Sequence, residues 1–359
     1  MGRFDAEFFK GNREQLQRLF TGKAPIVLTA NGLLQSSADL TFPFRQDSNF
    51  WYLTGLDEPD VVLVMEWSKE YLILPNRADW RDKFDGKVEV DRLSTLSGIK
   101  TIYDHKTGWK MLSNRLRKAK HVATLAPPPE YIDSHGFYTN PSKAHLVKMM
   151  KEYNQKLELL DLKQHLTTMR TRKQDVEIEA IRSAIDITTK TLQRITSKNW
   201  HSFKSEADIA AAISQSFHTQ GASGQAFDSI VAIGSNACVI HHLPDNQPIK
   251  GGGVVLFDIG AQVDHYAADV SRTFYLGKPT RRANRIYQAV LEVKDYALGL
   301  LKPGVVIKNY EIEVEKFMGE KLRELGLIKS IDHDSVRKYF PHATTHHLGL
   351  DAHDLADYQ

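Results

Sequence analysis

The stretch VVLFDIGAQVDHYAADVSRTF places two aspartates, Asp258 and Asp269, on either side of a polar turn. If the turn is centred between Val263 and Asp264, antiparallel pairing sets Asp258 directly opposite Asp269, with Cβ atoms about 4.5–5.5 Å apart. Carboxylates this close repel each other, so a divalent cation, or a proton on one of them, must offset the charge. Two cations about 3.5–4 Å apart could share a bridging carboxylate. The alternative is that the aspartates lie on opposite faces or cap the turn.

A histidine-rich segment, HATTHHLGLDAHD, begins at His342. His342 and His346 have the spacing of a helical zinc site, but that motif needs a glutamate directly after the first histidine, and Ala343 stands there. The threonines and the glycine of the segment favour strand and loop over helix. A second cluster, His241 and His242, follows an apolar run, so we expect it at a strand end, where site residues often lie.

The elements that must position these side chains alternate between strand and helix, which indicates an α/β fold. Apolar, β-rich runs predict strands within 25–30, 61–66, 71–75, 227–235, 253–261 and 272–277. Apolar residues at helical spacing predict helices within 12–20, 109–119, 144–160, 173–195, 205–222, 283–301 and 311–327. The helix at 205–222 should begin after an N-cap at Ser205 and stop at Gly221. A boundary near residue 165 divides the chain into domains 1–165 and 166–359.

Composition excludes several classes of protein. The chain of 359 residues has 47 Lys and Arg against 44 Asp and Glu, interspersed, so we predict no binding of nucleic acid or membrane surfaces. No apolar run is long enough to span a bilayer. The single cysteine, Cys238, cannot form an intrachain disulfide, which fits a reducing compartment. We therefore expect a soluble, cytoplasmic protein.

With these motifs in hand, the chain resembles the aminopeptidase P and prolidase group of metallopeptidases, which share the pita-bread fold with methionine aminopeptidase and creatinase. Three motifs carry the resemblance: FRQDSNFWYLTGLDEPD from Phe44 to Asp60, the aspartate hairpin, and the histidine-rich segment. The resemblance covers nearly the whole chain. It implies an N-terminal α/β domain like that of creatinase and aminopeptidase P, followed by a pita-bread catalytic domain.

The resemblance also implies roles for individual residues. The metal ligands it implies are Asp258, Asp269 and His346, with Asp269 bridging two divalent cations, most plausibly Mn²⁺. The histidines that match substrate-pocket or catalytic positions are His241, His342 and His353. His353 is similar to a family histidine that binds substrate and stabilises the reacting centre, whereas His242 and His347 match structural positions.

The implied activity is release of the N-terminal residue from peptides with proline in the second position. In this family two glutamates complete a set of five ligands, and both are expected after Asp354, where LADYQ contains none. We therefore expect the 359 residues to lack the last strands of the pita-bread sheet and to have a deficient metal site. The alternatives are an Xaa-Pro dipeptidase (prolidase) and a non-catalytic peptide- or protein-binding module. The resemblance further implies a homo-oligomer.

Overall fold

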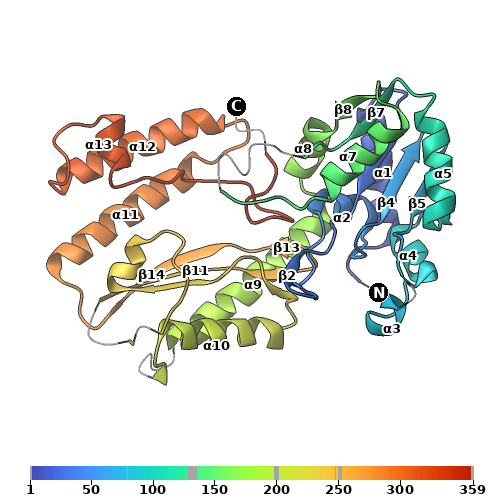
Figure 1. Ribbon diagram of the computed structural model, residues 1–359. Coiled ribbons are helices and arrows are strands. Elements are labelled where there is room, and N and C mark those ends of the chain that lie inside the picture. Colours follow the sequence, from blue (N-terminus) through green and yellow to red (C-terminus); the bar gives the residue numbers. More distant parts are fainter. Residues whose placement is uncertain are drawn as a thin grey trace. The chain divides into compact units, whose positions relative to one another are not determined.

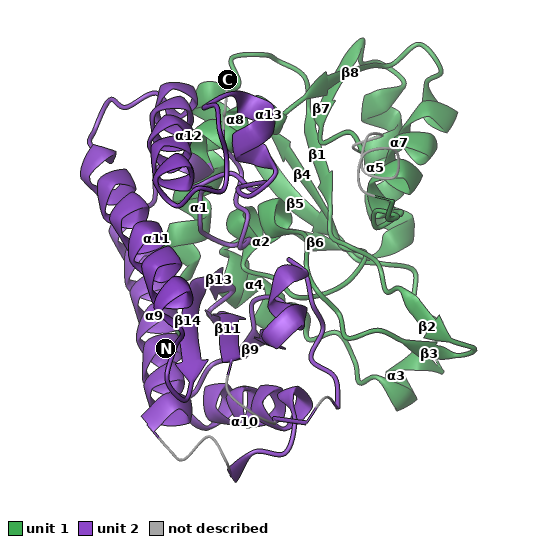
Figure 2. Ribbon diagram, turned by 90° about the vertical axis from the view of Figure 1, so that its left-hand side faces the viewer, with its two compact units in different colours: residues 1–169 green, residues 170–359 purple. Residues whose placement is uncertain are grey.

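The computed structural model describes residues 2–78, 80–127, 136–197, 202–246, 248–249 and 253–356. Contacts divide the chain into two units, residues 1–169 and 170–359, coloured separately in Figure 2. The domain boundary at residue 165 stays a prediction. Both units combine helices with β-sheet, so the predicted α/β class is right. Among the described residues, no helix is both long enough and apolar enough to cross a membrane.

The first unit is built on a six-stranded mixed sheet with the order β6-β5-β4-β1-β7-β8. Its strands are β1 (Ile26–Thr29), β4 (Val62–Glu66), β5 (Lys69–Ile73), β6 (Ile102–Tyr103), β7 (His121–Thr124) and β8 (Glu158–Asp161). A small hairpin joins β2 (Gln35–Ser37) to β3 (Leu40–Thr41). The helices are α1 (Ala6–Leu19), α2 (Ser48–Thr54), α3 (Arg81–Phe84), α4 (Val90–Ser97), α5 (His105–Leu116), α7 (Ser142–Tyr153) and α8 (Lys163–Thr171).

The core of the first unit forms where α5 and α7 cover one face of this sheet (Figure 1). Trp109 and Leu112 of α5 and Met150 of α7 are buried against Val27 and Val64 of the central strands. Burying side chains of this size removes a large apolar area from water, which is the main favourable term in folding.

The second unit carries the residues singled out for chemistry. Its main sheet has the order β10-β11-β14, and a smaller one has the order β13-β12-β9. The strands are β9 (Gly224–Gln225), β10 (Ile230–Ile233), β11 (Gly253–Ile259), β12 (Ala261–Val263), β13 (Tyr266–Ala267) and β14 (Val270–Leu276). The helices are α9 (Asp175–Ser197), α10 (Glu206–Thr219), α11 (Arg281–Leu300), α12 (Ile307–Glu324) and α13 (His333–Arg337), with a short 3₁₀ turn, η2 (Gly234–Cys238).

Two hydrophobic clusters hold the second unit together. α9 and α10 pack on the main sheet through residues such as Leu192, Ile213 and Phe217. A separate cluster joins α11, α12 and α13, with Val314 and Val336 among its buried members. The start of α10 is as predicted, because the Ser205 side chain accepts a hydrogen bond from the backbone N–H of Asp208. Gly221, at φ +91°, directly follows its C-cap.

The predicted register of the aspartate hairpin is wrong. Asp258 pairs with Ser271, not with Asp269. The turn is formed by Asp264 and His265, which both have positive φ, 48° and 69°, so it is centred one residue later than predicted. Two such residues give a tight turn whose twist matches that of the flanking strands. Asp269 is therefore a diagonal neighbour of Asp258 on the same face of the sheet, a spacing of about 7–8 Å between backbones that side chains can still bridge.

Candidate metal centre

The carboxyl groups of Asp258 and Asp269 lie close enough to influence each other's pKa despite the shifted register. Asp258 also accepts a hydrogen bond from the Ser271 hydroxyl at 2.8 Å. Burial raises the pKa of Asp258, and the neighbouring charge of Asp269 raises it further. Two carboxylates this close repel each other, so a proton on one of them or a nearby cation must offset their charge.

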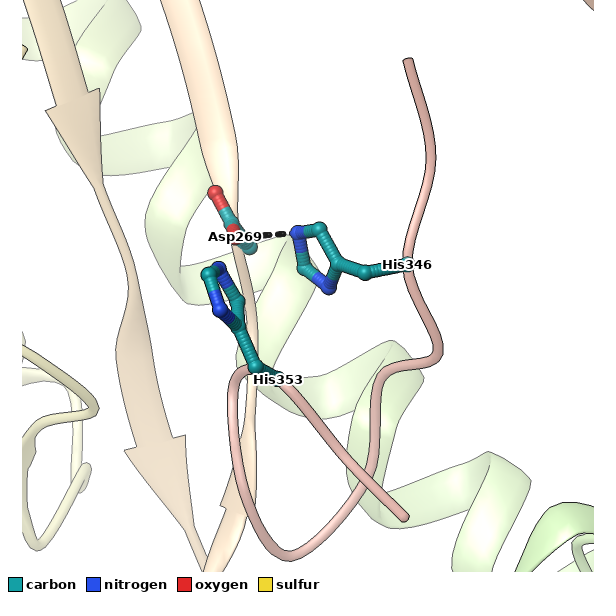
Figure 3. Close-up of side chains that lie close together, drawn as sticks. All are labelled: Asp269, His346 and His353. Atoms are coloured by element: carbon teal, nitrogen blue, oxygen red, sulfur yellow. Dashed lines mark ion pairs between the residues drawn. The ribbon is translucent and has the colours of Figure 1, made fainter. Parts of the chain in front are cut away.

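The His346 imidazole lies against the second of these aspartates. Its Nε2 atom is 3.2 Å from Oδ2 of Asp269, as drawn in Figure 3. That hydrogen bond raises the pKa of His346. Burial raises the pKa of Asp269, but the hydrogen bond and charge of His346 outweigh it, and the net pKa of Asp269 is lowered. Protonated His346 and ionised Asp269 therefore stabilise each other.

The geometry of His346 favours a particular metal-binding atom. Nδ1 lies 3.0 Å from the carbonyl oxygen of His347, and since a carbonyl can only accept, Nδ1 must carry the hydrogen. Nε2, on the side facing Asp269, is then the nitrogen that could bind a metal in the neutral ring. Fixing the tautomer through the second nitrogen is the usual arrangement of histidine ligands.

His353 completes the cluster in Figure 3. Its ring centroid is 4.2 Å from that of His346. Burial lowers the pKa of His353, and the charge of His346 lowers it further, which favours the neutral ring. Asp269, His346 and His353 each offer a donor atom within 4.8 Å of the others. Carboxylate oxygens and imidazole nitrogens suit a divalent cation such as Mn²⁺ or Zn²⁺, so the chemistry of this group fits the metal that the resemblance implies. Two of its members, Asp269 and His346, are predicted ligands, whereas the third is His353 and not Asp258.

A cavity of about 360 Å³ opens beside the cluster. Polar groups of Asp258, Asp269, His241 and His353 line one part of it. The rest of its wall is made mainly by Phe227, Ile230, Leu243 and Ala352, with Asp228 also at the edge. The cavity therefore offers an apolar surface next to acid–base groups, as small-molecule sites commonly do.

The structure brings the six site residues predicted from the sequence to two neighbouring cavities, with His342 on the second of them. His342 lines a neighbouring cavity of about 900 Å³ beside α12 and α13, and its Nδ1 donates to the carbonyl of Ala343 at 2.8 Å. His346 and His353 border this second cavity as well. The roles assigned to these residues stay predictions.

Sequence reasoning missed Glu206, whose side chain is fully buried. It accepts hydrogen bonds from the backbone N–H of Ile233 and from Nε2 of His242, both at 2.7 Å, and from the Asn236 amide. Glu206, His242 and Asp245 also lie close enough to resemble a metal site. Because several donors already share the carboxylate, we interpret it as holding the segment that carries His241. An acid in the first turn of a helix is too common to signal this role.

Sequence reasoning also missed Glu311 of α12. Its carboxylate accepts hydrogen bonds from the backbone N–H groups of Thr344 and Thr345, at 3.0–3.1 Å. These donors directly precede His346, so Glu311 fixes the backbone that presents this histidine. The spacing of α12 residues gave no indication of the contact, since it joins positions far apart in the sequence.

Known proteins match both units of the chain. Residues 179–359 match metallopeptidase family M24, and residues 9–124 match the N-terminal domain of aminopeptidase P. The Xaa-Pro aminopeptidase of Haemophilus influenzae is 29% identical over 373 residues, covering 100% of this chain and 83% of that protein. The structure of proline aminopeptidase P II from Yersinia pestis has a TM-score of 0.85 at 25% identity, covering 100% of this chain and 84% of that one.

Escherichia coli aminopeptidase P with the inhibitor Pro-Leu has a TM-score of 0.82 at 28% identity, covering 100% of this chain and 83% of that one. These matches confirm the predicted order of an aminopeptidase P-like N-terminal domain followed by a pita-bread domain, and they confirm the metallopeptidase class. The family M24 match alone spans half of the sequence. The chain thus belongs to metallopeptidase family M24, as a member of its aminopeptidase P group.

Proposed function

We propose that this protein is a metal-dependent aminopeptidase that releases the N-terminal residue from peptides with proline in the second position. The observation that carries the proposal is the contact chain from Asp258 through Asp269 to His346, beside a cavity lined by His241 and His353. The names of the relatives support the substrate class: one is an Xaa-Pro aminopeptidase, and another was solved with Pro-Leu.

Asp258, Asp269 and His346 would hold the divalent cations. When bound, such ions act as Lewis acids and lower the pKa of water enough to give a nucleophile near neutral pH. His241 and His353 face the cavity, where either ring can hydrogen-bond the carbonyl oxygen of the bond before proline and stabilise the charge that develops on it. Phe227, Ile230 and Leu243 would exclude water and contact the proline ring.

The donor set near the two aspartates contains no glutamate among the residues that the structure describes. The resemblance implies two glutamate ligands, so we expect these 359 residues to bind metal weakly and to turn over slowly. The second candidate is a non-catalytic module that binds peptides or proteins through this cavity. Mn²⁺ as the metal, a cytoplasmic location and a homo-oligomeric state are also parts of the proposal.

The test is hydrolysis of an Xaa-Pro-Xaa tripeptide with added Mn²⁺, with Asp258→Ala as the matched variant. We expect slow, Mn²⁺-dependent release of the first residue that Asp258→Ala abolishes. Cleavage of Xaa-Pro dipeptides in preference to the tripeptide would identify a prolidase instead. Peptide binding without any turnover would support the binding module, and turnover unchanged in Asp258→Ala would refute the metal site.

A further inference from the structure

The segment that carries His346 and His353 folds back on itself as a closed loop. The backbone N–H of Asp354 donates to the carbonyl of His347 at 2.9 Å, which closes residues 347–354 at the neck. His346 and His353 each directly precede one of the two residues joined at the neck. Their ring centroids are 4.2 Å apart. Closure of the loop therefore sets the distance between two side chains of the candidate metal centre. We call residues 346–354, which include both histidines, the histidine loop.

Two cations at the beginning of the second unit hold the base of this loop. The carboxylate of Asp354, whose side chain is 1% exposed, accepts from Nζ of Lys173 at 2.8 Å and from the Arg170 guanidinium. Arg170, at 2% exposure, also donates to Oδ2 of Asp351 at 2.9 Å. These two positive and two negative side chains form a largely buried network, and the buried carboxyl of Glu177 lies near Lys173 and Asp354.

The loop fits this network closely. A Cβ atom on Gly349 would lie 2.3 Å from Oδ2 of Asp354 and 3.0 Å from Cε of Lys173, so only glycine fits there without displacement. The carbonyl of Gly349 accepts from the backbone N–H of Ala267 at 2.8 Å. Ala267 precedes Asp269 by two residues on the hairpin, so the loop is attached to the strand that presents this aspartate.

Moving the histidine loop away from Arg170 and Lys173 would break buried ion pairs. Removing one partner from such a pair leaves an uncompensated charge in a low-dielectric setting, which is strongly unfavourable. The positions of His346 and His353 therefore depend on cations far from them in the sequence. The residues that orient metal ligands from outside the ligand set commonly change metal affinity 10–100-fold when mutated.

We propose that Arg170 and Lys173 are positioning residues. They act through Asp354 to hold the His346 and His353 rings at their observed distance from each other. Neither cation belongs to the predicted site. The inference deepens the proposed function and rests on it for one of two readouts, metal affinity. The other readout, the contact between the two rings, is independent of any metal.

The experiment compares Lys173→Met with the conservative variant Lys173→Arg. Lys173 is preferred to Arg170, whose replacement at a nearly inaccessible position could prevent folding. Lys190→Met is the matched control, because Lys190 pairs with Asp186 at 2.6 Å on an exposed face of α9. Far-UV circular dichroism establishes that each variant is folded before it is compared.

The first readout is the nuclear Overhauser effect between the His346 and His353 rings in the histidine-labelled, metal-free chain. We expect it to be lost in Lys173→Met and retained in Lys173→Arg and Lys190→Met. The second is Mn²⁺ affinity by titration calorimetry, with a loss of about 10-fold in Lys173→Met alone. A folded Lys173→Met that keeps both the ring contact and the affinity would overturn the proposal.

The two readouts also separate this inference from the proposed function. If the parent chain binds no Mn²⁺ while the ring contact is lost in Lys173→Met, the metal site is refuted and the positioning role stands. If all variants bind Mn²⁺ equally and the ring contact persists in each, the metal site stands and the positioning role is refuted.

Discussion

Gly260 sets the distance between the strands at the candidate metal centre. In the register of the hairpin it lies opposite Asp269, between β11 and β12. A Cβ atom there would come within 1.8 Å of the carbonyl oxygen of Ala268 and 2.9 Å of the Phe227 ring. A side chain at position 260 would therefore displace the backbone directly before Asp269.

We predict that Gly260→Ala destabilises the protein by about 3 kcal/mol or more, since the added methyl group meets backbone that cannot rotate away. The matched control is Gly253→Ala at the start of β11, where nothing lies within 4 Å of the added atom. Urea denaturation of both variants measures the difference. Equal stability of the two variants would contradict the close approach.

At the scale of single residues, part of the site could be predicted and part could not. Asp258, Asp269 and His346 stand out because carboxylates and histidines are dense in short motifs. The pairing register of the strands that carry the two aspartates could not be predicted, because the Asp264–His265 turn lacks the glycine that usually marks a two-residue turn. Glu206 and Lys173 gave no signal either. Each acts through a partner brought near only by the fold.

Among the elements, α9 is joined to the hairpin by hydrogen bonds as well as by packing. The hydroxyl of Thr188 accepts from the backbone N–H of Ala261 at 2.9 Å, and the Tyr266 hydroxyl donates to Glu177 at 2.8 Å. Apolar packing alone tolerates small shifts between a helix and a sheet, whereas these bonds can form in one register only. The hydrogen bonds therefore fix the position of the hairpin along the length of α9, and packing holds the hairpin against the helix.

A second junction between elements, α12 with α13, should depend on pH. Glu315 of α12 bonds to His333 at 2.7 Å and forms an ion pair with Arg337, both on α13. Burial raises the pKa of Glu315, but its bonds to His333 and Arg337 outweigh burial, and the net pKa lies below its ordinary value of 4.5. The folded state therefore favours the carboxylate.

Because the folded pKa is lowered, the stabilisation is fully present above pH 4.5 and is lost as pH falls through the folded pKa. We predict that Glu315→Gln costs about 1 kcal/mol near pH 7 and that the difference from the parent shrinks below pH 4.5. Glu313→Gln, at an exposed position of the same helix, is the control. Denaturation curves from pH 3 to 7 would contradict the assignment if the cost of Glu315→Gln stayed constant.

At the scale of the whole molecule, each unit has a hydrophobic core of its own. The strand and helix patterns predicted the longer helices and several strands of both units, because long apolar periodicity survives in any α/β arrangement. They missed β6, β7 and β8, and β8 begins within the stretch 144–160 that was predicted to be helical. They could not predict how α11, α12 and α13 gather into a separate cluster. That grouping depends on which faces meet, as in the contact of Gly319 with Ile331 and Val336.

We predict that Mn²⁺ stabilises the second unit alone, because all the proposed ligands belong to it. A ligand at 100 times its Kd adds about 2.7 kcal/mol to the folded state it binds, which corresponds to a rise in Tm of about 5 °C or more. Calorimetry should show this rise. Tryptophan fluorescence should not show the rise, because four of the five tryptophans precede residue 170 and therefore report on the first unit. Equal shifts by both probes would contradict the prediction.

The two-residue turn at Asp264 and His265 has a consequence for how the site assembles during folding. A hairpin with so short a turn closes at small entropic cost and on a microsecond timescale. It can bring Asp258 and Asp269 together early, while His346 and His353 must wait for a much longer stretch of chain to close. We therefore expect the acidic half of the site to form first, and the ability to bind a cation to be among the last properties that the folding chain acquires.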